Sequence, residues 1–417
     1  MEFHIKENHK NSDDHQQREN VFQRLPQEVL IDILSRLPAT SLIQFRFVCK
    51  TFQNSAYDRD LIQMHLSRAK QNNPFLILHC DYPLNNEIYF VEFPDKENQE
   101  RVKRIQTPFS ADMPEFSVIG SCDGILCLVN SLFSDQIYIY NPFTRMYSKL
   151  PKSVVFQNQK LLFGFGCHPV SKDYKIIKII YWPDPGIASG GTSGGVWEDS
   201  PWGFGRLRGR RFMRSEVQVF SLGGEKWRSI GAIPYNLDQL TGVVLVNGRL
   251  HWVDHEIVFR GLIVSFDISD EEFREIRMPD QNQCVTRGDY HLAALRGCLS
   301  VCIPVFTGLG GGLDIWIMKE YDVKESWVKQ FKVGNYLPKI ISQEIISQAH
   351  GIWRNVLDRR PVRVLRIQDN GDILLEYKGG TLASYDPDKE TFKDVIFPGL
   401  PNLFQTIVHV GSINWIE

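Results

Sequence analysis

The residues of this sequence that could do chemistry stand singly rather than in catalytic or metal-binding groups. His168, His251 and His291 each lie in a strand-like or turn-like stretch. None has a serine, aspartate or cysteine partner at the spacing of a nucleophilic motif, and Cys167 beside His168 does not make a metal site. We interpret these histidines as packing residues and expect no catalytic residue, no metal and no cofactor.

The chain has eight cysteines and no CxxC pair. Two pairs of them sit inside apolar, strand-like runs, as small buried hydrophobic residues of a reducing compartment do. No cysteine stands in a recognisable basic and exposed motif, so none is a candidate reactive thiolate. The cysteines are Cys49, Cys80, Cys122, Cys127, Cys167, Cys284, Cys298 and Cys302.

The glycine-rich stretch GLGGGLD, residues 308–314, looks like a phosphate-binding loop but lacks the lysine. A phosphate cradle also needs the N-terminus of a helix, whereas the strand-like run DIWIM follows here. We therefore interpret the stretch as a turn.

A tract rich in Gly, Ser and Arg, residues 185–214, interrupts the strand pattern around it. Its composition predicts a flexible insertion, which a surface loop tolerates without any function. Two alternatives stay open: a target-binding loop anchored by Arg and aromatic side chains, or a basic patch for nucleic acid or nuclear import. The candidate target-binding residues are Trp197, Trp202, Phe204, Arg206, Arg208, Arg210 and Arg211.

The 417-residue chain has the composition of an ordinary folded protein, with 43% hydrophobic and 23% charged residues. Its formal net charge of −2 gives no overall attraction to nucleic acid or an anionic membrane, so we expect neither as a partner. No apolar run reaches the roughly 18 residues of a membrane-spanning helix. Residues 1–20 are polar, contain no signal core and are predicted to be a disordered leader. With no N-x-[ST] acceptor, these features favour the cytoplasm, the nucleus or both.

Residues 21–70 form a first module with helical periodicity. Val29, Ile33 and Leu37 recur at every fourth position and predict one apolar face of a helix. Pro38 should end that helix, because proline has no N–H group for the helical hydrogen-bond pattern.

A second helix should follow, capped by Thr40 or Ser41, and a third is expected over residues 58–68. A module this small is marginal without a disulfide, a metal or a partner. Part of its apolar surface must therefore contact another protein or the rest of the chain.

The stretch LPQEVLIDILSRLPATSLIQFRFVCKTF, residues 25–52, resembles the F-box over its whole length and without gaps, with Phe52 where the family usually has Trp. The resemblance implies that these helices bind a Skp-type adaptor, which joins the cullin and RING subunits of a ubiquitin ligase. In physical terms, amphipathic helices would insert into an apolar groove of a partner. The implied adaptor-binding residues are Leu25, Pro26, Val29, Leu30, Ile33, Leu34, Leu37, Pro38, Leu42, Phe45, Val48, Cys49 and Phe52.

From residue 74 onward, short apolar runs are separated by Gly, Asn, Asp and Pro, which predicts strands and turns. Tight hairpins, marked by turns such as Asp123-Gly124, Asn247-Gly248 and Asn370-Gly371, alternate with hairpins that have an acidic or Pro-containing turn. Six of each kind can be counted, which predicts a kelch-like β-propeller of about six blades.

We expect the ring to close by pairing of the last inner hairpin, Ile407–Ile416, with the first outer hairpin, Ile88–Ile105. A propeller closed in this way does not need the N-terminal helices for its core. We therefore expect another protein, rather than the propeller, to cover the apolar surface of the helices.

The β region resembles the F-box-associated domain of plant F-box proteins in segments such as GSCDGILCLV, VNGRLHWV and SFDISDEEFREI. The expected fold class is α + β multidomain, with a three-helix F-box over residues 21–70 and an all-β propeller over residues 74–417. The resemblance implies a non-enzymatic substrate-recognition subunit of a Skp–cullin–F-box ubiquitin ligase. Its propeller would recruit an unidentified protein for ubiquitination and proteasomal degradation. The alternatives are a ligase-independent scaffold and a propeller-based enzyme.

Overall fold

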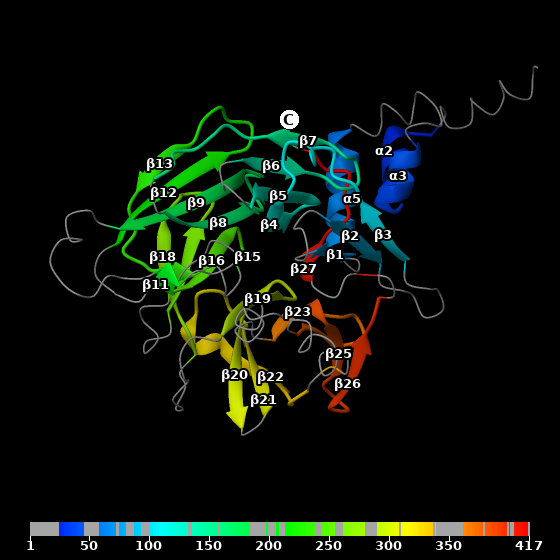
Figure 1. Cartoon of the computed structure of the whole chain (residues 1–417). Helices are drawn as coiled ribbons and strands as arrows, with labels where there is room; N and C mark the ends of the chain where they lie inside the picture. The colour runs from blue at the N-terminus through cyan, green and yellow to red at the C-terminus, as the bar shows by residue number, and fades with distance from the viewer. Residues whose placement is uncertain are drawn as a thin grey trace, which may run out of the picture.

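The computed structural model is a ring of β-sheets with a group of helices beside it (Figure 1). The predicted leader, residues 1–20, lies outside the residues that the structure describes. The described residues are 25–45, 58–71, 75–80, 87–92, 101–131, 136–156, 159–183, 197–198, 206–207, 213–238, 243–254, 262–279, 290–307, 310–336, 338, 362–377, 380–397, 400 and 404–415.

Three α-helices precede the first strand of the described chain: α2 (Gln27–Leu34), α3 (Ala39–Phe45) and α5 (Arg59–Gln71). Pro26 occupies the N-cap of α2, where an N–H group is not needed, and Pro38 lies between α2 and α3. The predicted three helices and their proline boundary are confirmed.

The start of α3 differs from the prediction. The carbonyl of Pro38 accepts hydrogen bonds from the N–H groups of Ser41 and Leu42, at 2.9 and 3.1 Å. The helix therefore begins at Ala39, and Thr40 and Ser41 lie within it. The prediction that one of them caps the helix is wrong, because the first turn is already built on Pro38.

Asp58 caps α5. Its Oδ1 atom accepts hydrogen bonds from the N–H groups of Asp60 (2.8 Å) and Leu61 (3.3 Å). An acidic side chain at this position satisfies N–H groups that have no partner inside the helix. The helix then runs to Gln71, past the predicted end at residue 68.

The strands form six blades around a common centre, and β4, β15, β19, β23 and β27 lie closest to that centre in Figure 1. The prediction of a three-helix module followed by an all-β propeller of about six blades is confirmed.

A short 3-10 helix, η1 (Lys324–Ser326), lies between two strands of blade 5. Blade 1 contains β27 (Phe404–His409), β1 (Phe75–Cys80), β2 (Ile88–Glu92) and β3 (Arg101–Ile105); blade 2, β4 (Phe116–Cys122), β5 (Ile125–Asn130), β6 (Ile137–Tyr140) and β7 (Tyr147–Lys149); blade 3, β8 (Lys160–Cys167), β9 (Tyr174–Pro183), β12 (Met213–Ser221) and β13 (Arg228–Gly231); blade 4, β14 (Leu237–Asp238), β15 (Val244–Val246), β16 (Arg249–Asp254), β17 (Leu262–Asp267) and β18 (Phe273–Arg277); blade 5, β19 (His291–Leu295), β20 (Cys298–Thr307), β21 (Gly310–Met318) and β22 (Trp327–Val333); blade 6, β23 (Arg363–Ile367), β24 (Ile373–Glu376), β25 (Leu382–Asp386) and β26 (Thr391–Val395).

The ring closes in blade 1 through one strand from the C-terminal part of the chain. β27 pairs antiparallel with β1 along its whole length, from Phe75↔His409 to Cys80↔Phe404. The prediction that the C-terminal part of the chain closes the ring in this blade is confirmed, but two details of it are wrong. Residues 411–415 form no strand, and β27 pairs with β1 rather than with the predicted hairpin Ile88–Ile105. The run 75–80 supplies the second strand of the blade instead, because its apolar side chains are buried on both sheet faces.

The alternation of strand direction gives the propeller two different faces. Turns that join the first to the second strand of a blade, and the third to the fourth, lie on one face, which we call the turn face. Connections between the second and third strands, and between blades, lie on the opposite face, which we call the loop face. The insertion at residues 185–214 leaves β9 at Pro183 and returns at its pairing partner Met213, so it is attached to the loop face.

The inner turns follow the sequence signals closely. Asp123 and Asn247 have φ values of 52° and 50°, and the glycines after them, Gly124 and Gly248, have φ values of 86° and 73°. Two successive residues with positive φ match the tight hairpin turn predicted for Asp-Gly and Asn-Gly.

The outer turns share a polar residue at their start. Asn141, Asp267 and Asp386 each accept, through a side-chain oxygen, a hydrogen bond from the N–H group two residues later. In each turn, the residue four positions after this polar residue has a positive φ: Arg145 (62°), Glu271 (62°) and Glu390 (54°).

Two interpretations of single motifs can be compared with the fold. His251 and His291 are buried in the propeller, as predicted for packing residues, whereas the ring of His168 accepts a hydrogen bond from the N–H group of Ser171 within a turn. The stretch GLGGGLD is largely a strand rather than a turn, since β21 already begins at Gly310.

Candidate functional site

Two exposed apolar residues of the helical module lie on the outward face of α2, and another, Met64, lies on α5. Val29 and Ile33 lie one helical turn apart, with 43% and 47% of their surface exposed, and Leu25 at the start of the module is 37% exposed. Residues four apart in a helix share one face. The structure therefore presents a short apolar stripe, flanked by the exposed Pro26 and Pro38.

Three other adaptor-binding candidates lie inside the module. Leu30, Leu34 and Leu42 are buried in one apolar cluster with Leu61 of α5. Leu37 and Phe45 are half-buried against the same cluster. The structure thus places Leu30, Leu34 and Leu42 in the interior of the module, where their side chains hold the helices together. Val48, Cys49 and Phe52 lie outside the described residues.

Charged groups fix α2 against α5. The guanidinium of Arg68 donates to the backbone carbonyl (2.8 Å) and to a carboxylate oxygen (2.5 Å) of Asp32, and also contacts the hydroxyl of Ser35. Arg36 forms a second ion pair with Asp32 at 2.9 Å. Arg68 and then Arg36 hold the pKa of the Asp32 carboxyl below its ordinary value. The orientation of the exposed stripe is thus set by α5 as well as by α2.

The helical module also packs on the propeller. Ile413, behind β27, belongs to the buried cluster of the helices, and Phe143 of blade 2 packs against it. At the end of α5, Lys70 Nζ lies 2.6 Å from Asp123 Oδ1 in the inner turn of blade 2. The expectation that another protein alone covers the helical surface is therefore wrong: the propeller covers part of it, at the turn face of blades 1 and 2.

The candidate target-binding residues are only partly described. Trp197 lies in β10 (Trp197–Glu198) and Arg206 in β11 (Arg206–Leu207), and the two strands pair antiparallel. The insertion thus contains a short ladder that its Gly-rich composition did not indicate. Trp202, Phe204, Arg208, Arg210 and Arg211 lie outside the described residues.

The loop face carries an apolar feature that the sequence reasoning missed. Val154 and Val155, in the connection between blades 2 and 3, are each 56% exposed. Beneath them, Lys178 Nζ donates to Ser153 Oγ (2.6 Å) and to the carbonyl of Val154 (3.1 Å), which holds this extended segment in place. A pair of β-branched residues just outside a strand was the available signal.

The base of this connection is supported by aromatic rings. Phe156 and Trp182 stack with centroids 4.1 Å apart and planes only 2° from parallel. Trp182 lies one residue before the point where the insertion leaves β9. Exposed valines, a stacked aromatic pair and the start of the insertion therefore adjoin one another on the loop face.

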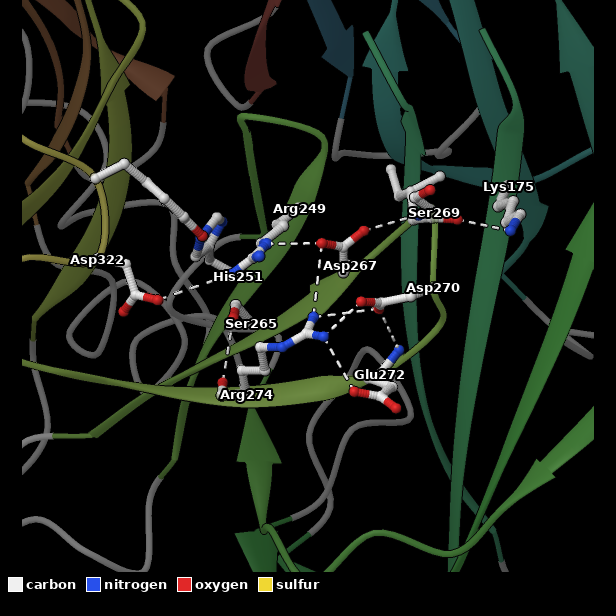
Figure 2. A network of polar contacts seen from close by, with 12 residues as sticks. Lys175, Arg249, His251, Ser265, Asp267, Ser269, Asp270, Glu272, Arg274 and Asp322 are labelled. Carbon is white, nitrogen blue, oxygen red and sulfur yellow. Dashed lines mark hydrogen bonds and ion pairs between the residues drawn. The ribbon is translucent and has the colours of Figure 1, made fainter. Parts of the chain in front are cut away.

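A network of charged side chains lies on the turn face of blades 4 and 5 (Figure 2). Arg249 Nε donates to Asp267 Oδ2 at 2.9 Å, and Arg249 Nη1 lies 3.9 Å from Asp322. Arg274 approaches the same oxygen of Asp267 at 3.6 Å and also pairs with Asp270 and Glu272. These opposite charges satisfy one another, so the network links neighbouring turns.

Glu271 extends the network to blade 3. It accepts hydrogen bonds from Lys175 (2.8 Å) and Arg228 (2.6 Å). Burial alone would raise the pKa of Glu271, but these two cations outweigh it and leave that pKa below its ordinary value. The network therefore ties blades 3, 4 and 5 together and is a structural feature.

His251 lies beside this network and is not a candidate base. His251 Nδ1 lies 3.1 Å from the carbonyl oxygen of Val244. Because a carbonyl oxygen can only accept a hydrogen bond, Nδ1 carries the ring proton, and Nε2 accepts a hydrogen bond from the hydroxyl of Tyr321 at 2.8 Å. Burial lowers the pKa of His251 to about 4, which keeps the ring neutral. Both ring nitrogens are occupied, as for a packing residue.

Among the described residues, no group of three or more His, Cys, Asp or Glu side chains is placed to hold a metal ion. In the same part of the chain, each helix is too short or too polar to span a membrane.

Two family profiles match the chain. The F-box domain profile covers residues 22–63, and the profile of the F-box associated beta propeller domain covers residues 76–407. The helices and the propeller described above coincide with these two regions. The chain belongs to the family of F-box proteins with an F-box-associated β-propeller.

The relatives place it more narrowly among plant F-box proteins. The chain is similar to the Arabidopsis thaliana F-box protein At3g07870, with 40% identity over 404 residues that cover 95% of this chain and 93% of the relative. It is also similar to the F-box protein CPR1 of that plant, at 26% over 410 residues covering 93% and 88%. The F-box/kelch-repeat protein At3g23880 of that plant is 24% identical over 387 residues, covering 87% of each chain.

Proposed function

We propose that the protein is the target-recognition subunit of a Skp–cullin–F-box ubiquitin ligase. Its helices bind a Skp-type adaptor, which joins the cullin and RING subunits, and its propeller binds a target protein. The observation that carries this proposal is the exposed stripe of Leu25, Val29 and Ile33 on a helical module of the F-box family.

The stripe has the properties of a helix that fits an apolar groove. The inward side of α2 is already filled by Leu30 and Leu34, so the helix is rigid before it meets a partner. Binding then costs little ordering, and the free energy comes from burying the two side chains that protrude. Val29 and Ile33 are therefore the expected anchors of the adaptor contact.

The target is assigned to the loop face. The helical module occupies part of the turn face at blades 1 and 2, whereas the long connections and Val154 with Val155 belong to the opposite face. The protein itself supplies no chemistry in this proposal. It raises the effective concentration of target lysines near a ubiquitin carrier that other subunits hold.

The direct test is the affinity for a purified Skp-type adaptor, measured by calorimetry on the full chain. The double variant Val29→Arg with Ile33→Arg should bind at least about 100-fold more weakly, because two charges replace the apolar anchors. Both positions are exposed, so the folded state should keep its thermal midpoint.

A matched control places the same changes on the propeller. Val170 and Val328 are also exposed apolar residues, and Val170→Arg with Val328→Arg should leave the adaptor affinity unchanged. Unchanged binding by the Val29 and Ile33 variant would reject the proposed adaptor contact.

A further inference from the structure

The segment of residues 411–415 lies between the helices and the propeller. Ile413 is 8% exposed and sits in the apolar cluster of the helices. A Cβ atom at Gly411 would come within 2.4 Å of the ring of Phe75 and 2.9 Å of the ring of Phe143, so only glycine fits at that point. The segment therefore contacts the helices on one side and blades 1 and 2 on the other.

Asn141 holds this segment in a way that a carboxylate could not. Its Oδ1 atom accepts hydrogen bonds from the N–H groups of Phe143 (2.8 Å) and Thr144 (3.1 Å), which forms the outer turn of blade 2. Its Nδ2 group donates to the carbonyls of Ser412 (3.0 Å) and Asn414 (2.6 Å). An amide has both a donor and an acceptor, whereas an ionised carboxylate only accepts.

The corresponding positions of two other blades support this reading. Asp267 in blade 4 and Asp386 in blade 6 form the same kind of turn with a carboxylate oxygen. The turn alone therefore accepts aspartate. The amide in blade 2 coincides with the presence of residues 411–415 below it.

A second set of contacts joins the same segment to α5. Asn414 Nδ2 donates to the carbonyl of Asp123 (3.2 Å) and to the hydroxyl of Tyr174 (2.9 Å). That hydroxyl in turn donates to Asp123 Oδ2 at 3.1 Å, and Asp123 Oδ1 pairs with Lys70 of α5. The carboxylate of Asp123 is nearly buried, with 7% of its side chain exposed, whereas 46% of the Lys70 side chain is exposed, so water screens this ion pair in part.

We propose that residues 411–415, held by Asn141 and by the Lys70–Asp123 ion pair, form a clamp that fixes the direction of the adaptor-binding helices relative to the propeller. Asn141 and Lys70 are positioning residues for ubiquitin transfer, because that transfer needs the target held at a defined distance and angle from the carrier. This inference rests on the proposed function, but the orientation of the helices can be measured without it.

The test measures the distance between two labels on the full chain. Non-canonical amino acids at Gln44 of α3 and Glu325 of η1, both exposed, carry the labels. The starting protein should give one narrow distance distribution. Asn141→Asp keeps the acceptor for the turn and loses both donated hydrogen bonds, so its distribution should broaden into more than one component. Asp386→Asn, the reverse change in blade 6, should leave the distribution narrow.

Lys70→Met tests the clamp a second time, from the helical side and without a substitution in the propeller. Its control is Lys319→Met, which removes an exposed lysine paired with Gln330. The expected result is a broadened distribution for Lys70→Met and a narrow one for Lys319→Met. Adaptor affinity, measured in parallel, should stay within the range of the starting protein for all four variants. A lower unfolding midpoint with an unchanged narrow distribution in both Asn141→Asp and Lys70→Met would show that these residues only stabilise the fold and would overturn the clamp.

The two proposals fail in different ways. If the Val29 and Ile33 variant still binds the adaptor, the proposed function is contradicted, but the measured label distances and the clamp are not affected. Narrow distances in the Asn141 and Lys70 variants contradict the clamp and leave the adaptor contact untouched.

Discussion

Leu34 of α2 and Ile413 behind β27 lie in the same buried apolar cluster, although one belongs to the helical module and the other to the propeller chain. The helices therefore complete part of their core with residues that become available only when the ring is closed. The helical module and blade 1 are expected to lose structure together.

Replacing Leu34 with alanine should destabilise the helices strongly. Leu34 is 4% exposed, and removing such a side chain from a packed core costs about 2–5 kcal/mol. Val29→Ala, one turn away on the exposed face, should cost roughly 0.5 kcal/mol or less. Native-state hydrogen exchange of the amides of α2 and α5 would measure both values, and equal effects would contradict the inward and outward division of α2.

Two truncations should separate closure of the ring from docking of the helices. Removal of residues 404–417 deletes β27 and exposes the edge of β1, so the unfolding midpoint should fall by roughly 10 °C or more and the protein should self-associate. Removal of residues 411–417 keeps β27 and should lower the midpoint less, while exchange in α5 becomes faster. Calorimetry and light scattering report the two effects. If the protein without residues 404–417 had the same unfolding midpoint as the full-length protein, closure of the ring by β27 would be ruled out.

The exposed valines of the loop face provide a test of where the target binds. Val154→Asp with Val155→Asp, made in a chain that no longer binds the adaptor, should reduce the recovery of proteins that the propeller captures from plant extract. Val170→Asp on the turn face serves as the matched control, since Val170 is 83% exposed. Quantitative mass spectrometry compares the captured sets, and identical sets for both variants would place the contact elsewhere.

The stability of the propeller should decrease below neutral pH. Burial lowers the pKa of His251 to about 4 and those of His291 and His409 to about 3, against an ordinary value of about 6.5 in the unfolded chain. Below about pH 6.5 the unfolded chain binds protons that the folded protein does not, so the free energy of unfolding falls with pH until the folded pKa values are reached. At pH 5 each of these histidines lowers the free energy of unfolding by about 2 kcal/mol relative to neutral pH.

Denaturant titrations at pH 7.5, 6 and 5 would measure this slope. His251→Gln has no titrating group at that site and should show a shallower dependence than the starting protein. A slope that is the same in both proteins would mean that His251 is not held neutral by burial.

Two inner turns form a matched pair for a glycine substitution. Gly248 and Gly297 have φ values of 73° and 78°. An alanine held in this left-handed backbone conformation is destabilised by about 1–2 kcal/mol. A Cβ at Gly248 would also lie 2.6 Å from the ring of His168 and 2.7 Å from Pro169, whereas nothing lies within 4 Å at Gly297. Gly248→Ala should therefore be the more destabilising change by about 1–3 kcal/mol in chemical denaturation. Equal effects would contradict the close contact between blades 3 and 4 at this turn.

Local signals in the sequence were sufficient for most of the propeller. Asp123-Gly124 and Asn247-Gly248 dictate their turns through the backbone angles they favour, and the alternating runs beside them become paired strands. The end of the ring was harder to predict. The run from Ile407 onward contains Gly411 in a position that suggests a hairpin, but this glycine is required by the nearby rings of Phe75 and Phe143 instead.

The candidate site shows the same division. The period of α2 identifies an amphipathic helix, but Val29 and Leu30 are equally apolar, and the sequence alone does not say which of them faces inward. That choice depends on Leu61 and Ile413, which lie far away along the chain. The role of Asn141 likewise depends on the carbonyls of Ser412 and Asn414, a contact that no local pattern records.

The pairing of β27 with β1 has a consequence for biosynthesis. β27 and the segment behind it follow every other strand that the structure describes, so a ribosome must release them before the ring can close. Until then the helices lack Ile413, and their outward stripe has no fixed direction. An unfinished chain could therefore engage an adaptor without holding a target at a defined angle to it, so productive ubiquitin transfer would depend on completed closure of the ring.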